Sequence, residues 1–220
     1  MKKLLIVLAV AVLSLSLPLT ASAQGIALGA KIGTLGPGLD LTVSLVDRLN
    51  LRVNGNYLKI SAETTQSDID YDADLTLGSA LAMLDWHPFG NNFRISAGAV
   101  YNGNELGLEA TPTDSVEIGG TDYTPAQIGT LTGDATFDKF GPYIGIGFGN
   151  AVKEDMALTF VFDLGVVFHG SPEINLDADG PVAGIPSFQA DLADEEQQVE
   201  DDISAFKIYP VLAFGVSYHF

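Results

Sequence analysis

Eight segments of this chain alternate large apolar residues with small, polar or charged residues at a period of two. The C-terminal segment shows the pattern most clearly, because Phe214, Val216, Tyr218 and Phe220 share one phase and smaller or polar residues lie between them. Such a period places alternate side chains on opposite faces of a β-strand. We therefore expect an all-β chain with strands in residues 25–33, 38–46, 49–57, 71–83, 93–102, 138–149, 156–170 and 206–220.

Charged residues lie in or beside these strands, in the phase opposite to the large apolar residues. Both basic and acidic residues occur among them, and a soluble sandwich would have no need for them. A narrow barrel lumen suits them, because buried charges must be paired. We predict that the following side chains enter the lumen: Lys31, Asp40, Arg52, Arg94, Lys139, Asp163 and Lys207. In residues 71–83, the same reasoning places Leu81 and Met83 on the lipid side and Asp72 and Asp74 on the lumenal side.

The connections between the strands alternate in length. Short turns are expected at residues 47–48, 88–91 and 153–155, and longer connections at 63–69, 105–133 and 171–205, the last two much longer. Short periplasmic turns and long outer loops are typical of bacterial outer-membrane barrels. The pattern predicts a transmembrane antiparallel up-and-down β-barrel of eight strands with long acidic extracellular loops. Ten strands are the alternative if a long loop contributes a hairpin.

The N-terminus has the features of a secretory signal peptide. Lys2 and Lys3 precede a short apolar core, and Ala21, Ser22 and Ala23 form a small-residue cleavage site. We expect residues 1–23 to be removed and residues 24–220 to form one barrel domain. The chain has no cysteine, which excludes disulfides, and its net charge of −18 argues against nucleic acid as a partner.

Tyr218 and Phe220, in phase with Leu212, Phe214 and Val216, resemble the C-terminal signature of outer-membrane barrel proteins. The eight-strand pattern as a whole is similar to the small OmpA-, OmpX- and OmpW-like barrels. This resemblance implies a Gram-negative outer membrane, with its lipid and lipopolysaccharide as partners. It also implies that Tyr218 and Phe220 form an assembly signal read by the barrel-assembly machinery. A monomer is expected, and the resemblance does not identify a subfamily.

The long loops are acidic, and residues 171–205 contain ten acidic residues and no lysine or arginine. Asn175, Asp177 and Asp179 occupy the first, third and fifth positions of a calcium-loop pattern, and Gly180 the sixth. The twelfth position is Pro186, so the bidentate glutamate is missing. The sequence requires no cofactor, and weak binding of Ca²⁺ or Mg²⁺ by these oxygen ligands is the hypothesis to test. The other interpretation is a solvated acidic surface.

Residues 186–206 have a helical pattern. Ser187 is a candidate N-cap, and a thin apolar stripe is formed by Phe188, Leu192, Val199 and Ile203. We expect a surface helix packed on the barrel rim, with a lid over the mouth as the alternative.

Three classes of function remain open at this point. The first is a structural or surface-interaction barrel with a filled lumen, and the second is a narrow channel or transporter for small solutes. The third is a lipid A-modifying hydrolase, because His169, Ser171 and Glu173 are similar to the site of outer-membrane lipid A deacylases. His169 lies in the lumenal phase, away from acyl chains, and the family's glutamate comes further along the chain than Glu173. We therefore expect a protein that is not an enzyme.

Overall fold

The computed structural model describes residues 25–66, 69–152, 157–204 and 206–220. The expected signal peptide and the turn expected at 153–155 lie outside the described residues. Among the described residues, no helix is long and apolar enough to cross a membrane.

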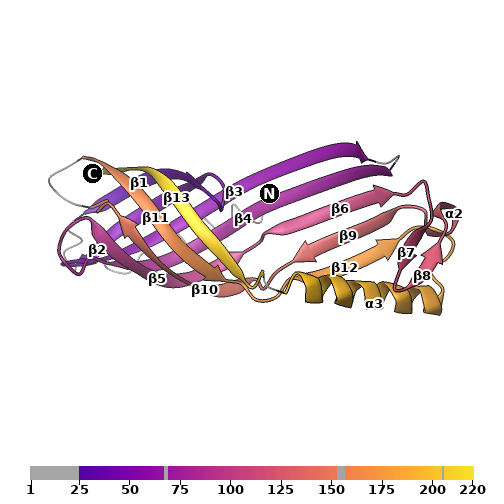
Figure 1. Cartoon of the computed structure of the whole chain (residues 1–220). Helices are drawn as coiled ribbons and strands as arrows, with labels where there is room; N and C mark the ends of the chain where they lie inside the picture. Colours follow the sequence, from indigo (N-terminus) through magenta and orange to yellow (C-terminus); the bar gives the residue numbers. More distant parts are fainter. Residues whose placement is uncertain (1–24, 67–68, 153–156, 205) are drawn as a thin grey trace.

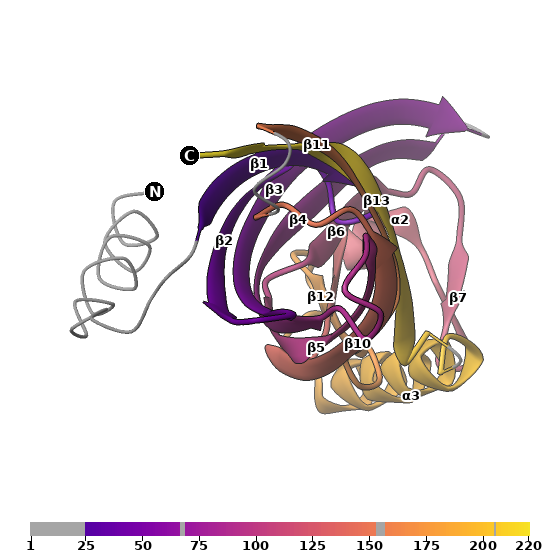
Figure 2. The same ribbon diagram turned by 90° about the vertical axis from the view of Figure 1, so that its left-hand side faces the viewer.

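Eight antiparallel strands form a closed barrel (Figures 1 and 2). The ring closes because the first strand pairs with the last, and the fourth with the fifth. In order around the barrel, the strands are β1 (Ile26–Gly33), β2 (Gly38–Val46), β3 (Leu49–Gln66), β4 (Ile69–Trp86), β5 (Phe93–Asn102), β10 (Phe140–Phe148), β11 (Leu158–Phe168) and β13 (Ile208–His219). The prediction of eight strands is confirmed, and the ten-strand alternative is wrong for the barrel.

Two strands of the barrel continue far beyond it. β3 and β4 have 18 residues each, which at about 3.4 Å per residue is roughly 60 Å. A membrane crossing needs only about 9–11 residues. The outer half of β4 pairs with β6 (Glu105–Thr111), which pairs with β9 (Leu131–Thr136), which pairs with β12 (Glu173–Ala178). We call this sheet, with the elements that cover it, the head.

The chain leaves the barrel and enters the head at a pair of glycines. Gly103 follows β5 and donates its N–H to the carbonyl of Gly78 in β4, at 2.7 Å. The N–H of Gly78 is held at 3.0 Å by the side chain of Asn104. On the barrel side of Gly78, β4 pairs with β5, and on the head side of Gly78 it pairs with β6. The long connection at 105–133 therefore continues the sheet outward without widening the barrel.

The long loops are folded, because the head has a hydrophobic core of its own. A hairpin of β7 (Val116–Ile118) and β8 (Thr121–Tyr123) lies with the short helix α2 (Pro125–Ile128) at the far end of the head sheet, and α3 (Pro186–Asp202) runs along its edge (Figure 1). Its buried residues are Ile118, Tyr123, Ile128, Ala178, Val182, Phe188 and Leu192. The predicted helix is confirmed as α3, although its N-cap is Ile185 instead of Ser187. It packs along β12 of the head, which corrects both the expected place on the barrel rim and the alternative of a lid over the mouth.

The barrel alternates as expected, with one exception. In β11 the residues Phe160, Phe162 and Leu164 are exposed on the outside, and Val161 and Asp163 are buried in the lumen. In β4 the expected phase is wrong, because Leu81 and Met83 are 3% and 2% exposed and face the lumen. Ala82, Leu84 and Trp86 are apolar too, so both faces of this strand look alike in the sequence.

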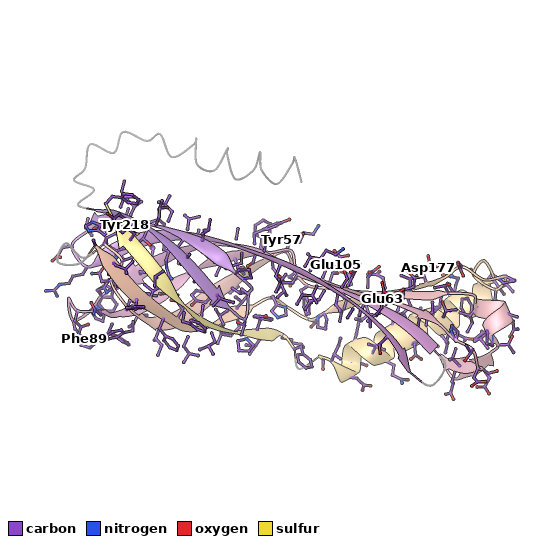
Figure 3. All side chains as sticks on the ribbon, turned by 90° about the horizontal axis from the view of Figure 1, so that it is seen from above. Tyr57, Glu63, Phe89, Glu105, Asp177 and Tyr218 are labelled. Atoms are coloured by element: carbon purple, nitrogen blue, oxygen red, sulfur yellow. The ribbon has the colours of Figure 1, made fainter. Side chains whose placement is uncertain are left out.

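The outside of the barrel is an apolar belt between two rings of aromatic residues. Trp86, Tyr218 and Phe220 are exposed at the end that carries the short turns. Tyr57 and Phe140 are exposed at the end that leads to the head, and Figure 3 shows Tyr57 where the barrel gives way to the head. Between the rings lie exposed aliphatic side chains, among them Leu28, Ile32, Leu84, Ile144, Ile146, Leu164 and Leu212. An exposed apolar band flanked by aromatic girdles is the arrangement that a lipid bilayer requires.

Candidate functional site

Four charged side chains meet in the lumen near the end with the short turns. The guanidinium of Arg52 contacts both carboxylate oxygens of Asp163, at 2.8 and 3.0 Å, and its Nε lies 2.8 Å from Asp85 Oδ2. Arg94 Nη2 lies 2.7 Å from Asp163 Oδ1. We call Arg52, Asp85, Arg94 and Asp163 the lumen cluster. Each of these side chains is no more than 4% exposed, so the two positive charges are compensated directly by the two negative charges.

The neighbouring lumenal charges follow the same rule. Lys31 Nζ lies 3.2 Å from Asp40 Oδ1, and both side chains are buried. Ser96 donates its hydroxyl to Asp85 at 2.5 Å, and Arg94 donates to the carbonyl of Phe162 at 3.2 Å. Burying an ion pair is tolerated only where the geometry is good, because both charges lose their hydration. Asp40 Oδ1, Arg52 Nε and Arg94 Nε have no hydrogen-bond partner among the described residues, but each lies within 4 Å of an opposite charge. The lumen therefore has the character of a polar core.

Glycine makes room for two large side chains of the lumen, Arg94 and Tyr143. A Cβ atom at Gly147 would lie 2.7 Å from Cζ of Arg94. A Cβ at Gly165 would lie 2.7 Å from the ring of Tyr143. The glycines of β10 and β11 thus leave the space that large lumenal side chains occupy. Eight-stranded barrels are just wide enough for such filling.

An apolar layer closes the lumen between the lumen cluster and the head. Its members are Leu35, Leu81, Met83, Val100, Tyr143, Val167 and Val211. One cavity of about 10 Å³ lies between this layer and Arg52, and another of about 10 Å³ lies among Asn50, His87 and Arg94. Each has room for about one water molecule. Both cavities lie within the lumen, next to Arg52 and Arg94 of the lumen cluster.

Solved structures share this architecture. CarO2 of Acinetobacter baumannii matches with a TM-score of 0.58 and 23% identity, and the match covers 89% of this chain and 98% of that chain. CarO of Acinetobacter baumannii matches with a TM-score of 0.56 and 20% identity over the same shares. The chain has the fold of an outer-membrane β-barrel. No protein-family model matches the sequence of this outer-membrane barrel, and no curated protein matches it significantly.

Five of the predicted lumenal charges are buried in the lumen, and two are not. Lys31, Asp40, Arg52, Arg94 and Asp163 lie where the alternation places them. Lys139 and Lys207 are exposed, which corrects the expectation for both. Each lies just before its strand, β10 or β13, at the rim that faces the head. A long side chain there reaches water at no desolvation cost.

Asp85 completes the lumen cluster and was missed by sequence reasoning. It shares the phase of Leu81 and Met83, which the apolar pattern had assigned to lipid. The one signal available was charge, because the predicted lumenal set contained five basic residues and only two acidic ones, and buried charges must be paired.

The predicted calcium ligands do not converge. Asn175 and Asp177 lie in β12 on one exposed face of the strand, and Asp179 follows it. Asp179 Oδ1 accepts a hydrogen bond of 2.7 Å from the N–H of Thr130 and so fastens the chain after α2. The segment is extended instead of looped, so the expected calcium-loop geometry is wrong. Among the described residues, no three His, Cys, Asp or Glu side chains come close enough to hold a metal ion.

The residues of the hydrolase alternative differ in their exposure. His169 is buried at the outer rim of the lumen, with its ring 4.3 Å from that of Phe137 and 6.0 Å from that of Tyr209. Ser171 and Glu173 are exposed. The structure gives no hydrogen bond between any two of these three residues.

The C-terminal aromatic residues face lipid at the end with the short turns. Tyr218 and Phe220 are 50% and 71% exposed, and their rings form an edge-to-face contact at 5.1 Å. The N–H of Phe220 donates to the carbonyl of Ile26 at 3.0 Å, so the last residue takes part in closing β13 onto β1.

Deleting Phe220 should lower the amount of folded barrel in the outer membrane and leave export intact. The deletion removes an aromatic contact and the last hydrogen bond of the closing seam. Heat-modifiable migration of the outer-membrane fraction on SDS gels measures the folded barrel. Unchanged levels of the folded form would show that Phe220 is not an assembly signal.

Proposed function

We propose that this outer-membrane barrel has a structural or surface-interaction role, in which a sealed barrel anchors an ordered acidic head outside the cell. The observation that carries the proposal is the combination of a filled lumen with a head that has its own core. Small solutes would need a continuous path, and the cavities beside the lumen cluster offer room for about one water molecule each. The ordered part that projects from the membrane is the head.

The head is built to stay folded in water. Phe188 is 1% exposed and meets the ring of Tyr123 edge to face at 4.8 Å. Tyr123 donates its hydroxyl to Asp191 of α3, and this hydrogen bond raises the pKa of Tyr123. Glu195 of α3 accepts the N–H of Gly119 at 3.1 Å and so binds the helix to the β7–β8 hairpin. A disordered loop would not form such contacts. A rigid surface suits recognition, because it loses little conformational freedom when a partner binds.

The outer face of the head sheet is acidic. Glu63, Asp72, Asp74, Glu105 and Glu109 alternate with apolar residues and lie on the face that continues the outside of the barrel. Figure 3 shows Glu63, Glu105 and Asp177 along the head. Binding of Ca²⁺ or Mg²⁺ by this face stays a prediction, and in the absence of converging ligands it takes the form of counterions held by the summed field. The channel and the hydrolase remain as alternatives without a specific observation in their favour.

Labelling of single cysteines tests the proposed display, because the chain has no cysteine of its own. Asp114 is exposed in the head and Asp47 is exposed in the turn between β2 and β3. On intact cells, a membrane-impermeant maleimide should label the Asp114→Cys variant and should label Asp47→Cys only after the outer membrane is permeabilised. Labelling of Asp47→Cys alone on intact cells would place the head in the periplasm and overturn the proposal.

A further inference from the structure

The two edges of the head sheet differ. At one edge, α3 covers β12 and two of its glutamates accept backbone N–H groups that would otherwise lack a partner. Glu196 Oε1 accepts the N–H of Leu176 at 2.6 Å, and Glu200 Oε1 accepts the N–H of Ile174 at 3.0 Å. The spacing matches, because four helical residues rise about 6 Å and two strand residues about 6.6 Å. This edge is closed to further strands.

The other edge is the outer half of β3. β2 pairs with β3 only as far as Asn56, and the last bond runs from the N–H of Tyr57 to the carbonyl of Pro37 at 3.1 Å. Beyond it, within the described part of the chain, β3 pairs only with β4. Residues 59–64 are exposed, and Figure 1 shows β3 as the outermost strand of the head.

The direction of the free backbone groups follows from antiparallel geometry. The N–H and C=O of one residue point to the same neighbouring strand, and alternate residues point to opposite neighbours. The backbone N–H of Tyr57 points toward β2, because it donates to the carbonyl of Pro37. The backbone groups of Lys59, Ser61 and Glu63 therefore point to the open edge, whereas those of Ile60 and Ala62 bond to β4. A row of unpaired groups of this kind is a template for an added strand.

The two faces beside this edge define what strand would fit. On the outer face, Glu63 lies opposite Asp72, and Ser61 lies opposite Asp74. On the inner face, Ile60 is 48% exposed and lies opposite Leu75. A strand that alternates basic and apolar residues would bring cations to the first face and cover the second.

Lys59 does not change this preference. A single lysine on an edge strand commonly discourages pairing. Here Lys59 Nζ lies 3.4 Å from Asp74 Oδ2, so its charge is already matched, and Glu63 and Asp72 outweigh it. A second copy of this chain is disfavoured at the edge because each chain has a net charge of −18.

We propose that the open edge of β3, residues 58–64, docks an extended cationic amphipathic peptide as an additional strand of the head sheet. Backbone hydrogen bonds from Lys59, Ser61 and Glu63 supply the affinity, and the acidic and apolar faces supply the selectivity. The inference rests on the proposed surface-interaction role and names the chemistry of its partner.

A proline at position 61 separates edge docking from charge attraction. In Ser61→Pro, the missing N–H is one that points to the open edge, so the hydrogen bonds between β3 and β4 are kept. Ser61→Ala is the matched control, because it keeps the N–H and loses only the side chain that contacts Asp74. The probe is a fluorescent peptide of about seven alternating lysine and isoleucine residues, long enough to span the edge. An analogue with N-methyl groups on alternate residues cannot complete the ladder.

Binding is measured by fluorescence anisotropy on the purified full barrel in nonionic detergent at about 0.15 M salt, with empty micelles as the blank. The wild type and Ser61→Ala should bind the probe equally, and Ser61→Pro should bind it about tenfold more weakly. Hydrogen exchange on the wild type gives a second readout, in which the probe protects the amides of Lys59, Ser61 and Glu63. Equal binding by wild type and Ser61→Pro without amide protection would overturn the proposal and show charge attraction alone.

Two other results would also overturn it. If the wild type dimerises, Ser61→Pro does not, and the probe fails to bind, the edge serves a second copy. If the probe fails to bind while Asp114→Cys is still labelled on intact cells, the inference fails and the proposed function stands.

Discussion

Replacing Asp163 with asparagine should lower the free energy of unfolding of the barrel by about 3–5 kcal/mol. Asp163 accepts hydrogen bonds from both terminal nitrogens of Arg52 and from one terminal nitrogen of Arg94, and all three side chains are buried. The substitution leaves two arginines to share Asp85, so one buried positive charge is uncompensated. Removing one partner of a buried charge network costs far more than breaking a surface pair.

Urea unfolding of the lipid-refolded barrel measures this loss, and the single tryptophan provides the signal. Trp86 is 51% exposed on the lipid-facing side, so its fluorescence reports departure from lipid. Asp72→Asn is the control, because it removes the same charge from an exposed position opposite Glu63. If Asp163→Asn lowered the free energy of unfolding no more than Asp72→Asn does, the lumen cluster would not stabilise the barrel.

Replacing Phe188 with alanine should destabilise the head by about 3–5 kcal/mol and leave the barrel folded. Phe188 is 1% exposed, and the cavity left by its ring would lie between α3 and Tyr123. The core of the head shares no residue with the apolar layer of the lumen. Loss of the Phe188 ring should therefore affect the core of the head and leave the apolar layer of the lumen unchanged.

Limited proteolysis of the purified protein shows the effect on the head, and heat-modifiable migration shows the state of the barrel. Phe188→Ala should be cut in α3 at protease concentrations that spare the wild type, with unchanged heat modifiability. Phe206→Ala is the matched control, because Phe206 is 64% exposed. Equal resistance of the two variants would contradict a head stabilised by its own core.

The barrel could be predicted from the sequence because lipid on one side and a narrow lumen on the other enforce a strict period of two. β13 is the clearest case, with Phe214, Val216, Tyr218 and Phe220 all exposed on the lipid side. The same rule failed in β4, where the lumen contains an apolar layer. Leu81 and Met83 belong to that layer, so hydrophobicity did not distinguish the two faces, and Asp85, in the same phase just beyond the expected strand, was not recognised as lumenal.

The head could be predicted only in part, because its pairings join residues far apart in the chain. The stripe of Phe188 and Leu192 identified α3. The strand β12 was mistaken for a calcium loop, because Asn175 and Asp177 alternate with apolar residues as a calcium-loop pattern also does. What makes it a strand is its pairing with β9, in which Asn175 lies opposite Asp134, and a single sequence does not specify that register.

Single-channel recording in planar bilayers is the most direct test of a sealed barrel that anchors a surface head. The purified wild type should insert and pass no current above the bilayer leak. A variant with Leu81, Met83 and Val211 replaced by glycine, which thins the apolar layer, shows whether an opening at this place would be detected. Discrete conductance steps from the wild type itself, of the size seen with the glycine variant, would contradict the sealed lumen and favour the channel.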